Sequence, residues 1–341
     1  MEALLGKSLT ELQEVAIEAG LQKFAGKQLA EWLYVRRVSS FDQMTNISLK
    51  GREALKTRYV TGRHAPVKEA VSADGTRKYL FEIKGQFIES VYIPEEDRAT
   101  LCVSTQVGCK MGCRFCMTGT LGFHGHLNAA EILNQIFEID SMASHHHLSP
   151  LSNLVYMGEG EPMDNIDNVL RSLEIMTADY GCLWSPKRIT VSTVGIPAMK
   201  RFLDESACHL AVSLHNPFAS ERSVIMPAER MLSIKEVVSL LKQYDWSHQR
   251  RVSFEYICWH GQNDTIRHAK ELLRLLKGLS CRINLIRFHA GVDRAFPSSD
   301  EKEMEWFRDY LTNNGITTTI RRSRGEDILA ACGLLAAKEA D

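Results

Sequence analysis

Apolar residues recur with two different periods along the chain, and the first stretch has a helical period. From Leu9 to about Tyr59 they lie three or four positions apart, as in Leu12, Val15, Ala16 and Ala19. This spacing places apolar side chains on one face of a helix. The sequence therefore predicts a small helical domain over residues 1–62, with basic side chains on its polar faces.

A second period begins near Val67, where apolar and polar residues alternate up to Pro94. We expect a β-hairpin with strands over Lys78–Ile83 and Phe87–Ile93, joined by a turn at residues 84–86. Glu89 lies inside the second strand between apolar neighbours. The pattern alone favours a carboxylate that decorates the sheet over one aimed at a site. We expect this hairpin to form a linker or extension over residues 63–98.

Strands and helices alternate from Ala99 onward, which is typical of parallel strands joined by helical crossovers. The strands are expected at Leu101–Val107, Asn153–Met157, Arg188–Thr193, His209–Leu214, Val252–Ile257 and Arg282–Phe288, with a seventh at Ile316–Arg321. The clearest helices are expected at Ala129–Met142, Ile166–Met176, Ile234–Gln243 and Thr265–Leu276. The run of histidines at residues 145–147 is expected in an exposed loop. We predict an α/β fold in which residues 99–341 form a partial, TIM-like (β/α)6 barrel with functional groups at the carboxyl ends of its strands.

Composition narrows the class of protein. The 341 residues are 44% apolar and 24% charged, which is ordinary for a globular protein with a large core. No apolar run is long enough to span a membrane and no signal peptide is visible, so we expect a cytoplasmic protein. The nine cysteines then indicate metal binding or catalysis in a reducing compartment. With a net charge of −1, nucleic-acid binding would depend on local basic clusters such as the one at residues 321–324.

Three of these cysteines, Cys109, Cys113 and Cys116, form a C-x3-C-x2-C array directly after the first predicted strand of the barrel. Thiolates at this spacing can hold zinc or an iron-sulfur cluster. Structural zinc takes four ligands and would need His124, His126 or a distant cysteine. A four-iron cluster on three cysteines keeps one iron open for a small molecule. The spacing admits both interpretations.

Glycines and polar residues follow four of the predicted strands. The segments are Met157-Gly158-Glu159-Gly160-Glu161-Pro162, Ser192-Thr193-Val194-Gly195, Ser213-Leu214-His215 and Phe288-His289-Ala290-Gly291. Because the carboxyl ends of barrel strands meet at one mouth, these segments should face the loop that carries the cysteine array. We therefore expect a binding site for a small cosubstrate there.

Two further cysteines are ambiguous from the sequence. Cys332 lies beside Gly333 after a basic stretch, where it could be a nucleophile with a lowered pKa or simply a small buried residue. Cys102 lies within the first predicted strand and leaves the same alternatives open.

The motifs of the chain occur together in an order that is typical of one enzyme family. They are Glu89-Ser-Val-Tyr-Ile-Pro, Arg98-Ala-Thr-Leu-Cys102-Val-Ser, the cysteine array, Gly160-Glu-Pro, Ser192-Thr, Ser213-Leu-His, Val252-Ser-Phe-Glu-Tyr, Asn263-Asp, Ile283-Asn-Leu-Ile and Arg324-Gly-Glu-Asp-Ile-Leu-Ala-Ala-Cys-Gly. In this combination the chain resembles the radical S-adenosylmethionine (SAM) RNA adenine methyltransferases of the RlmN/Cfr type. The resemblance is closest to the RlmN group and runs from the helical domain to Cys332.

The resemblance implies two cofactors and a substrate class. A [4Fe-4S] cluster would be held by Cys109, Cys113 and Cys116, with SAM on its open iron. The SAM site would be formed by Gly160, Glu161, Ser192, Ser213, Leu214, His215 and His289. The implied reaction is methylation of C2 of an adenosine in 23S ribosomal RNA and in certain transfer RNAs; the alternative is a Cfr-like reaction at C8.

Three residues take catalytic roles by the same resemblance. Cys332 would accept a methyl group from one SAM, and a second SAM would serve as radical source, so that this methyl carbon bonds to the RNA. Glu89 would be the proton acceptor for the ring proton. Cys102 would form a transient disulfide bond with Cys332 and so release the product.

The implied partners are the RNA and an electron donor such as flavodoxin, with the enzyme acting as a monomer away from membranes. The chain departs from the family pattern at Glu159, where a methionine is usual, at His289, where an asparagine is usual, and at Leu334, where a glutamine is usual. Two alternatives therefore stand beside the methyltransferase: a radical SAM enzyme with another substrate and a zinc-stabilised RNA-binding protein.

Overall fold

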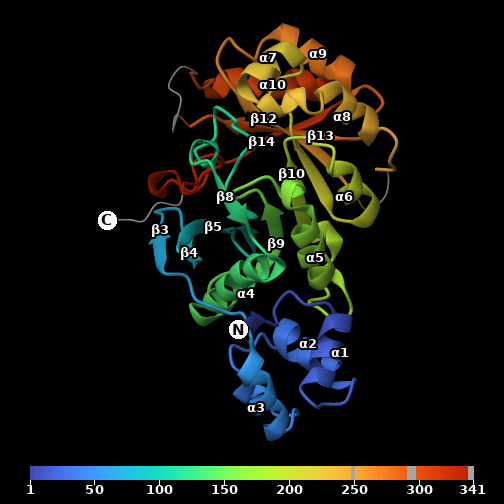
Figure 1. Ribbon diagram of the computed structural model, residues 1–341. Helices are drawn as coiled ribbons and strands as arrows, with labels where there is room; N and C mark the ends of the chain where they lie inside the picture. Colours follow the sequence, from blue (N-terminus) through green and yellow to red (C-terminus); the bar gives the residue numbers. More distant parts are fainter. Residues whose placement is uncertain (247–249, 290–296, 337–341) are drawn as a thin grey trace.

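The computed structural model describes residues 1–246, 250–289 and 297–336 (Figure 1). The helices are α1 Leu9–Glu18, α2 Ala25–Ala30, α3 Leu49–Arg58, α4 Ala129–His145, α5 Ile166–Thr177, α6 Met199–Glu205, α7 Ala219–Ile225, α8 Ile234–Leu241, α9 Ile266–Leu276 and α10 Glu301–Asn313. The strands are β1 Glu2–Ala3, β2 Tyr59–Val60, β3 Lys68–Val71, β4 Arg77–Ile83, β5 Gln86–Pro94, β6 Ala99–Cys102, β7 Gln106–Gly108, β8 Phe123–His126, β9 Leu151–Tyr156, β10 Ile189–Thr193, β11 His209–Ser213, β12 Val252–Cys258, β13 Arg282–Arg287 and β14 Thr317–Ile320.

One sheet runs through the described residues and has ten strands in the order β14-β13-β12-β11-β10-β9-β6-β5-β4-β3. Neighbouring strands from β6 to β14 are parallel. They follow one another in chain order, with helices between them (Figure 1). The predicted α/β fold with a partial barrel is confirmed, and the expected seventh strand is present as β14.

The hairpin that precedes the barrel continues the same sheet. Strands β3, β4 and β5 are antiparallel, and β5 pairs with β6 at the barrel edge. In this register Val91 lies opposite Lys78 on one side and Cys102 on the other. Residues two apart on a strand face the same side. Glu89, two positions before Val91, therefore lies on the sheet face that carries Cys102.

The single strand predicted up to Val107 is wrong. The structure breaks it at residues 103–105 into β6, which belongs to the main sheet, and β7, which pairs with β8 in a separate hairpin. Hydrogen bonds of Ser104 account for this break. The Ser104 hydroxyl donates to the main-chain oxygen of Glu89 (2.6 Å), and the Ser104 N–H donates to Oε1 of Gln135 (2.9 Å). These bonds redirect the chain from the sheet toward the strand-end side of the barrel.

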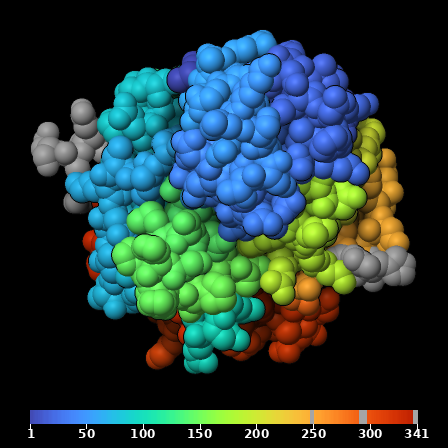
Figure 2. Space-filling view, turned by 90° about the horizontal axis from the view of Figure 1, so that it is seen from below, coloured from blue at the N-terminus to red at the C-terminus, as the bar shows by residue number. Residues whose placement is uncertain are grey.

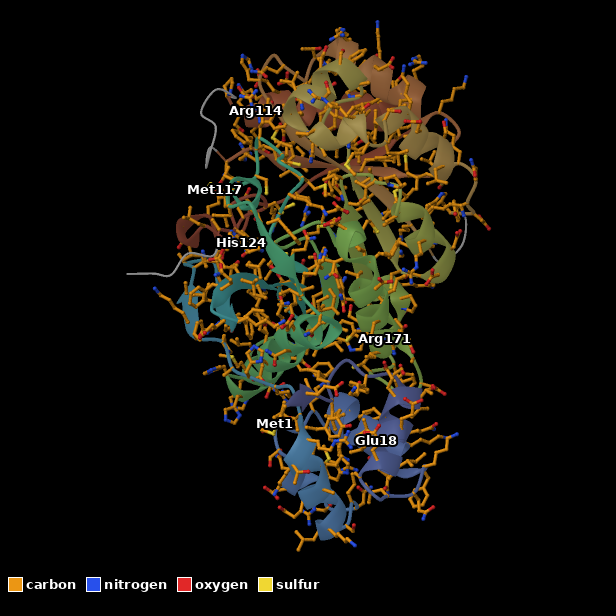
Figure 3. The ribbon with its side chains drawn as sticks, viewed as in Figure 1. Met1, Glu18, Arg114, Met117, His124 and Arg171 are labelled. Atoms are coloured by element: carbon orange, nitrogen blue, oxygen red, sulfur yellow. The ribbon has the colours of Figure 1, made fainter. Side chains whose placement is uncertain are left out.

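The N-terminal helices pack onto the barrel rather than standing apart from it. Their apolar side chains belong to one buried cluster that continues into the barrel. At the junction Arg171 of α5 pairs with Glu11 of α1 (2.9 Å), and Arg63 pairs with Glu138 of α4 (2.7 Å). Figure 2 shows the N-terminal residues in blue against the green segments of the barrel, and Figure 3 labels Arg171 at this junction.

Two further comparisons with the sequence analysis concern helices. Helix α4 extends to His145, so the first histidine of the run at residues 145–147 is helical, although all three are exposed as expected. Helices α6, α7 and α10 also lie between strands, where the sequence analysis expected helices without giving their bounds. None of the helices in the described part of the chain is long and apolar enough to cross a membrane.

Candidate functional site

The cysteine array lies in the loop between β7 and β8, where Figure 3 labels Arg114 and Met117. The two strands close on each other at Gly108, whose φ is +68° and where a Cβ atom would lie 1.9 Å from the oxygen of Gly122. Only glycine fits such a position. Directly after it, the Cys109 N–H donates to the Gly122 oxygen (2.8 Å), which fixes the start of the loop.

The array and most of the strand-end residues share one cavity of about 140 Å³. Of the predicted site residues, those that line it are Cys109, Cys113, Cys116, Gly160, Glu161, Ser192, Ser213, His215 and Cys332. The strand ends and the loop thus meet at one mouth, as expected from the barrel rule. Ser213 and His215 of the third strand-end segment line the cavity. Ala290 and Gly291 of the fourth segment lie outside the described residues.

The cysteine sulfurs fit a multi-iron cluster better than a single ion. Burial raises the pKa of Cys109 to about 12 and also raises the pKa of Cys113 and of Cys116. Such thiols bind as thiolates only when a metal supplies the opposing charge. Around one zinc ion, sulfurs lie about 3.8 Å apart, since Zn–S bonds are about 2.3 Å long. The three sulfur atoms here do not all lie within 4.8 Å of one another.

Neither histidine that a zinc site would recruit is directed to the array. Nε2 of His124 lies 3.0 Å from the main-chain oxygen of Leu121, and Nδ1 of His126 lies 3.1 Å from the side-chain nitrogen of Gln106. Both histidine side chains are exposed on β8. Neither His124 nor His126 is therefore placed to act as a fourth ligand, and the three thiols of the loop match the donor set of a cluster with one open iron.

Glu161 is the buried carboxylate of the cavity. Oε2 accepts from the Val194 N–H (2.9 Å) and Oε1 from the Met163 N–H (3.1 Å). Burial raises the pKa of Glu161 to about 7. Gly160, just before it, has a φ of +97°, and a Cβ atom there would lie 2.5 Å from the Gln106 side chain. A carboxylate held by main-chain donors can orient the amino group of a cosubstrate.

His215 ends its strand in a left-handed conformation, with a φ of +54°. Asn263 donates to the His215 oxygen (2.7 Å), and the Ile257 N–H donates to Nδ1 of the ring (3.1 Å). Surroundings that fix a residue this firmly are needed to hold strained backbone. Burial lowers the pKa of His215 to about 3, so the ring is neutral. It packs edge-on against Phe115 of the cysteine loop, with ring centroids 4.7 Å apart.

Two of the predicted SAM contacts are not brought to the cavity. The side chain of Leu214 is fully buried in the core, and its N–H donates to the main-chain oxygen of Glu255 (3.0 Å). Nε2 of His289 lies 2.6 Å from the Ser323 hydroxyl oxygen, and the residue lines the neighbouring cleft instead. Their roles stay predictions.

Cys102 and Cys332 come together although 230 positions separate them in the chain. Both line a small cavity of about 60 Å³ and both are free thiols. Burial raises the pKa of Cys102 to about 12, and the nearby Cys332 adds to this effect. Cys332 itself is exposed and also lines the cavity of the cysteine array. It therefore lies between the array and Cys102.

The segment that carries Cys332 is docked by main-chain bonds. The Met117 N–H donates to the oxygen of Gly333 (2.8 Å), and the Thr118 hydroxyl donates to the oxygen of Leu335 (2.8 Å). Both partners belong to the loop that follows the cysteine array, so the array and Cys332 are held together. Figure 1 shows this segment in dark red beside the loop.

Glu89 faces this segment. Its carboxylate is buried, with Oε1 2.8 Å from Nζ of Lys78 and with Oε2 accepting from the Ala336 N–H (2.9 Å). The Glu89 N–H donates to Oε1 of Glu159 (2.9 Å). The departure at Glu159 thus lies directly beside the predicted proton acceptor.

Several residues of the site received no role in the sequence analysis. Arg321 and Glu255 line the cavity of the cysteine array and form an ion pair (3.3 Å). The neighbouring Cys332 thiol raises the pKa of Arg321. The sequence did offer a reason to suspect Glu255, because it is a charged residue inside the largely apolar strand β12. Arg321 offered none, because in the sequence it is one member of a basic cluster that we expected to be exposed.

A larger cleft of about 860 Å³ opens beside Cys332. Its lining includes the basic residues Arg321, Arg322 and Arg324, and also the acidic residues 95–97, of which Glu95 pairs with Arg98 (2.5 Å). Cys332, Arg321 and Ile286 line both the cleft and the cavity of the array. A large substrate in the cleft could therefore reach the Cys332 thiol, which also borders the cavity of the cysteine array.

Comparison with known families agrees with this geometry. Residues 3–60 match the family described as the ribosomal RNA large subunit methyltransferase N-terminal domain, and residues 103–276 match the radical SAM superfamily.

Two similar relatives are proteins named probable dual-specificity RNA methyltransferase RlmN. That of Bacteroides fragilis is 58% identical over 336 residues, covering 97% of this chain and 95% of the relative. That of Porphyromonas gingivalis is 56% identical over 339 residues, covering 99% of this chain and 98% of the relative. A crystal structure of a radical SAM methyltransferase from Sphaerobacter thermophilus is similar with a TM-score of 0.92 and 37% identity, over 99% of this chain and 100% of that one.

Proposed function

Because the chain belongs to the RlmN family of radical SAM RNA methyltransferases, we propose that it methylates C2 of an adenosine in 23S ribosomal RNA and in transfer RNA through a methyl group carried on Cys332. As a radical SAM methyltransferase it uses a [4Fe-4S] cluster and SAM. When bound, these supply a deoxyadenosyl radical. A radical is required because C2 of adenine is an electron-poor ring carbon that does not attack an electrophilic methyl group.

The cavity of the cysteine array binds the cofactors. Cys109, Cys113 and Cys116 hold the cluster, and Glu161 orients the amino group of SAM. Gly160, Ser192, Ser213 and His215 complete the walls of the cavity around SAM. We assign no contact to Leu214, and we expect His289 to reach SAM only at the border of the cleft.

Cys332 carries the methyl group. Its sulfur accepts the methyl of one SAM. A hydrogen atom of this methyl would pass to the deoxyadenosyl radical that a second SAM supplies, the remaining methylene carbon bonds to the adenine ring, and the adduct would return one electron to the cluster. Glu89 then takes the ring proton. Cys102, as the thiolate, attacks the sulfur of Cys332, so that an S–S bond forms and the S–C bond breaks with its electron pair on the methylene carbon. This carbon takes up a proton and becomes the methyl group on the RNA.

One observation supports this proposal more than any other. Cys332 lines the cavity of the cysteine array, the small cavity of Cys102 and the open cleft. A methyl carrier needs access to the cofactor, the resolving thiol and the substrate, and this position offers all three. An RNA-binding protein stabilised by zinc would need none of them.

The same proposal implies two partners of the enzyme, an RNA and an electron donor. The RNA occupies the cleft, and the cluster takes its electrons from a donor such as flavodoxin. We expect the enzyme to act as a monomer in the cytoplasm. The position of methylation, C2 or C8, is decided by digestion of the modified RNA to nucleosides and comparison with the two methyladenosine standards.

The first prediction concerns Cys332. After anaerobic incubation of the iron-replete protein with SAM, peptide mass spectrometry should find one added methyl group on the Cys332 peptide. Cys332→Ala should remove it. Cys102→Ala should keep the methyl group and accumulate a covalent RNA–protein adduct, because the resolving thiol is missing.

An unmodified Cys332 in protein with an intact cluster would contradict the proposal and favour a radical SAM enzyme with another substrate. Iron analysis and the absorption of the cluster, measured on the same sample, show whether that condition is met.

A further inference from the structure

Lys78 is the cation that contacts the predicted proton acceptor. Its Nζ lies 2.8 Å from Oε1 of Glu89, and the two side chains are only 16% and 7% exposed. Lys78 belongs to β4 and lies opposite Val91, so it is the diagonal neighbour of Glu89 across the β4–β5 pair. Diagonal neighbours on one sheet face are within reach of long side chains.

The Lys78–Glu89 pair is more buried than the Arg77–Glu69 pair of the same antiparallel strands. Arg77 and Glu69 form a cross-strand pair (2.6 Å) between β4 and β3, with side chains 21% and 27% exposed, away from the cysteines. Lys78 instead lies on the sheet face that carries Cys102, and its Nζ is 3.5 Å from the main-chain oxygen of Leu329. It therefore contacts both the carboxylate and the segment that leads to Cys332.

The two carboxylate oxygens of Glu89 are held by unlike partners. Oε1 is held by Lys78, from a strand in the middle of the antiparallel part of the sheet. Oε2 is held by the Ala336 N–H, from the segment that carries Cys332. A shift of that segment toward a bound substrate would release Oε2 and leave the bond to Lys78 in place.

We propose that Lys78 is a positioning residue for the proton transfer: it holds Oε1 of the Glu89 carboxylate and so directs Oε2 to the ring proton. This rests on the proposed function, in which Glu89 is the proton acceptor. Without the Lys78 ammonium group, Oε1 would lose the contact that fixes the orientation of the carboxylate, and Oε2 would no longer be directed to the ring proton. Within the described part of the chain, Glu89 contacts the titratable side chains of Lys78 and Glu159, and Lys78 is the cation of the two.

The test follows the partial reactions of the iron-replete protein with SAM and an RNA substrate. In Lys78→Met, methyl loading of Cys332 should stay within about twofold of the wild type. The RNA–protein adduct should accumulate and product formation should fall by about tenfold or more, as expected when a general base is lost. Lys78→Arg should restore turnover, because it restores the charge.

A matched control is Lys84→Met. Lys84 lies in the turn of the same hairpin, its side chain is 79% exposed and its nearest carboxylate is that of Glu131 at 3.5 Å. This variant should behave like the wild type. Glu89→Gln should accumulate the adduct, and the double variant with Lys78→Met should be no slower than Glu89→Gln alone.

The outcomes separate the two proposals. If Glu89→Gln turns over the adduct normally, the proton-acceptor role of Glu89 fails, and the role of Lys78 fails with it. If Glu89→Gln accumulates the adduct but Lys78→Met does not, only the inference about Lys78 fails. A loss of methyl loading in Lys78→Met, without rescue by Lys78→Arg, would show a merely structural ion pair and overturn the inference.

Discussion

Arg222 shows at the scale of one residue how the strand ends of the site are held. Its side chain is fully buried. It donates to the main-chain oxygens of Leu214 (3.0 Å), Val194 (2.7 Å) and Ser213 (2.7 Å), and it pairs with the buried carboxylate of Glu229. These carbonyls end β10 and β11, where the predicted SAM contacts lie. One guanidinium therefore fixes the spacing of two strand ends.

We expect Arg222→Met to destabilise the protein by about 3 kcal/mol or more, because it leaves the Glu229 carboxylate and several carbonyl groups buried without a donor. Arg230→Met is the matched control, since Arg230 is exposed in the turn that follows α7, and it should change the free energy of unfolding by less than about 0.5 kcal/mol. Urea denaturation of both variants measures the difference. Equal stabilities would contradict the role of Arg222.

Single residues also show where sequence reasoning stops. The spacing of Cys109, Cys113 and Cys116 was sufficient to predict a metal or cluster site, because the three ligands come from one loop. Lys78 and Arg222 gave no such signal. Each is a basic residue in a short amphipathic element, and its burial depends on segments that are remote in the chain.

At the scale of elements, the sequence was most informative where one period persists. The parallel strands and the helices α4, α5, α8 and α9 lie close to their predicted bounds, because each has an apolar face against the core. The break between β6 and β7 was missed. Ser104, Thr105 and Gln106 are three consecutive polar residues between apolar ones, which does not by itself distinguish a strand from a break. The buried partners of Ser104 and Thr105, Gln135 and Glu159, show that the chain leaves the sheet.

The start of β11 gives a prediction about pH. Nδ1 of His209 accepts from the Arg251 N–H (3.0 Å), and the residue is buried. Burial lowers its pKa from 6.5 to about 4, with the charges of Arg250, Arg251 and Lys187 acting in the same direction. Above pH 6.5 the ring is neutral in both the folded and the unfolded state. Between pH 6.5 and 4 the unfolded state binds a proton that the folded state does not.

Stability should therefore fall as the pH falls through this window, by up to about 3 kcal/mol from His209. In His209→Asn the amide oxygen can replace Nδ1 as acceptor but does not titrate. The difference in unfolding free energy between wild type and variant, measured by urea denaturation at pH 7 and pH 5, isolates this residue from other groups. The wild type should lose more stability than the variant at pH 5, and an identical loss would contradict the prediction.

At the scale of the whole molecule, the sheet joins parts that the sequence analysis kept separate. The division into residues 1–62, 63–98 and 99–341 follows the changes of hydrophobic period. In the structure the hairpin extends the barrel sheet, and the N-terminal helices share its core. The sequence could not show this, because the pairing of β5 with β6 depends on register rather than on composition. That pairing is what places Glu89 and Lys78 on the face of Cys102.

The cleft beside Cys332 has a volume of about 860 Å³, and it is lined by side chains of both charges. Its lining includes Arg321, Arg322 and Arg324, and also the acidic residues 95–97. Phosphate groups are attracted to the arginines and repelled by the carboxylates. We therefore expect the RNA backbone to run along these three arginines, with the target base turned toward Cys332.

Arg322 is exposed in this cleft and makes the sharpest test, because it can be removed without disturbing buried contacts. If Arg322→Ala removes one phosphate contact, RNA binding should weaken several-fold at low salt. The slope of log affinity against log salt should become shallower by about 0.7 to 0.9, since one fewer counterion is released. Arg274→Ala is the control: Arg274 is exposed on α9 and pairs with Glu271, so its loss should change neither quantity. A weaker affinity with an unchanged slope would mean that Arg322 contacts a base or shapes the cleft, and the phosphate path would then have to lie elsewhere.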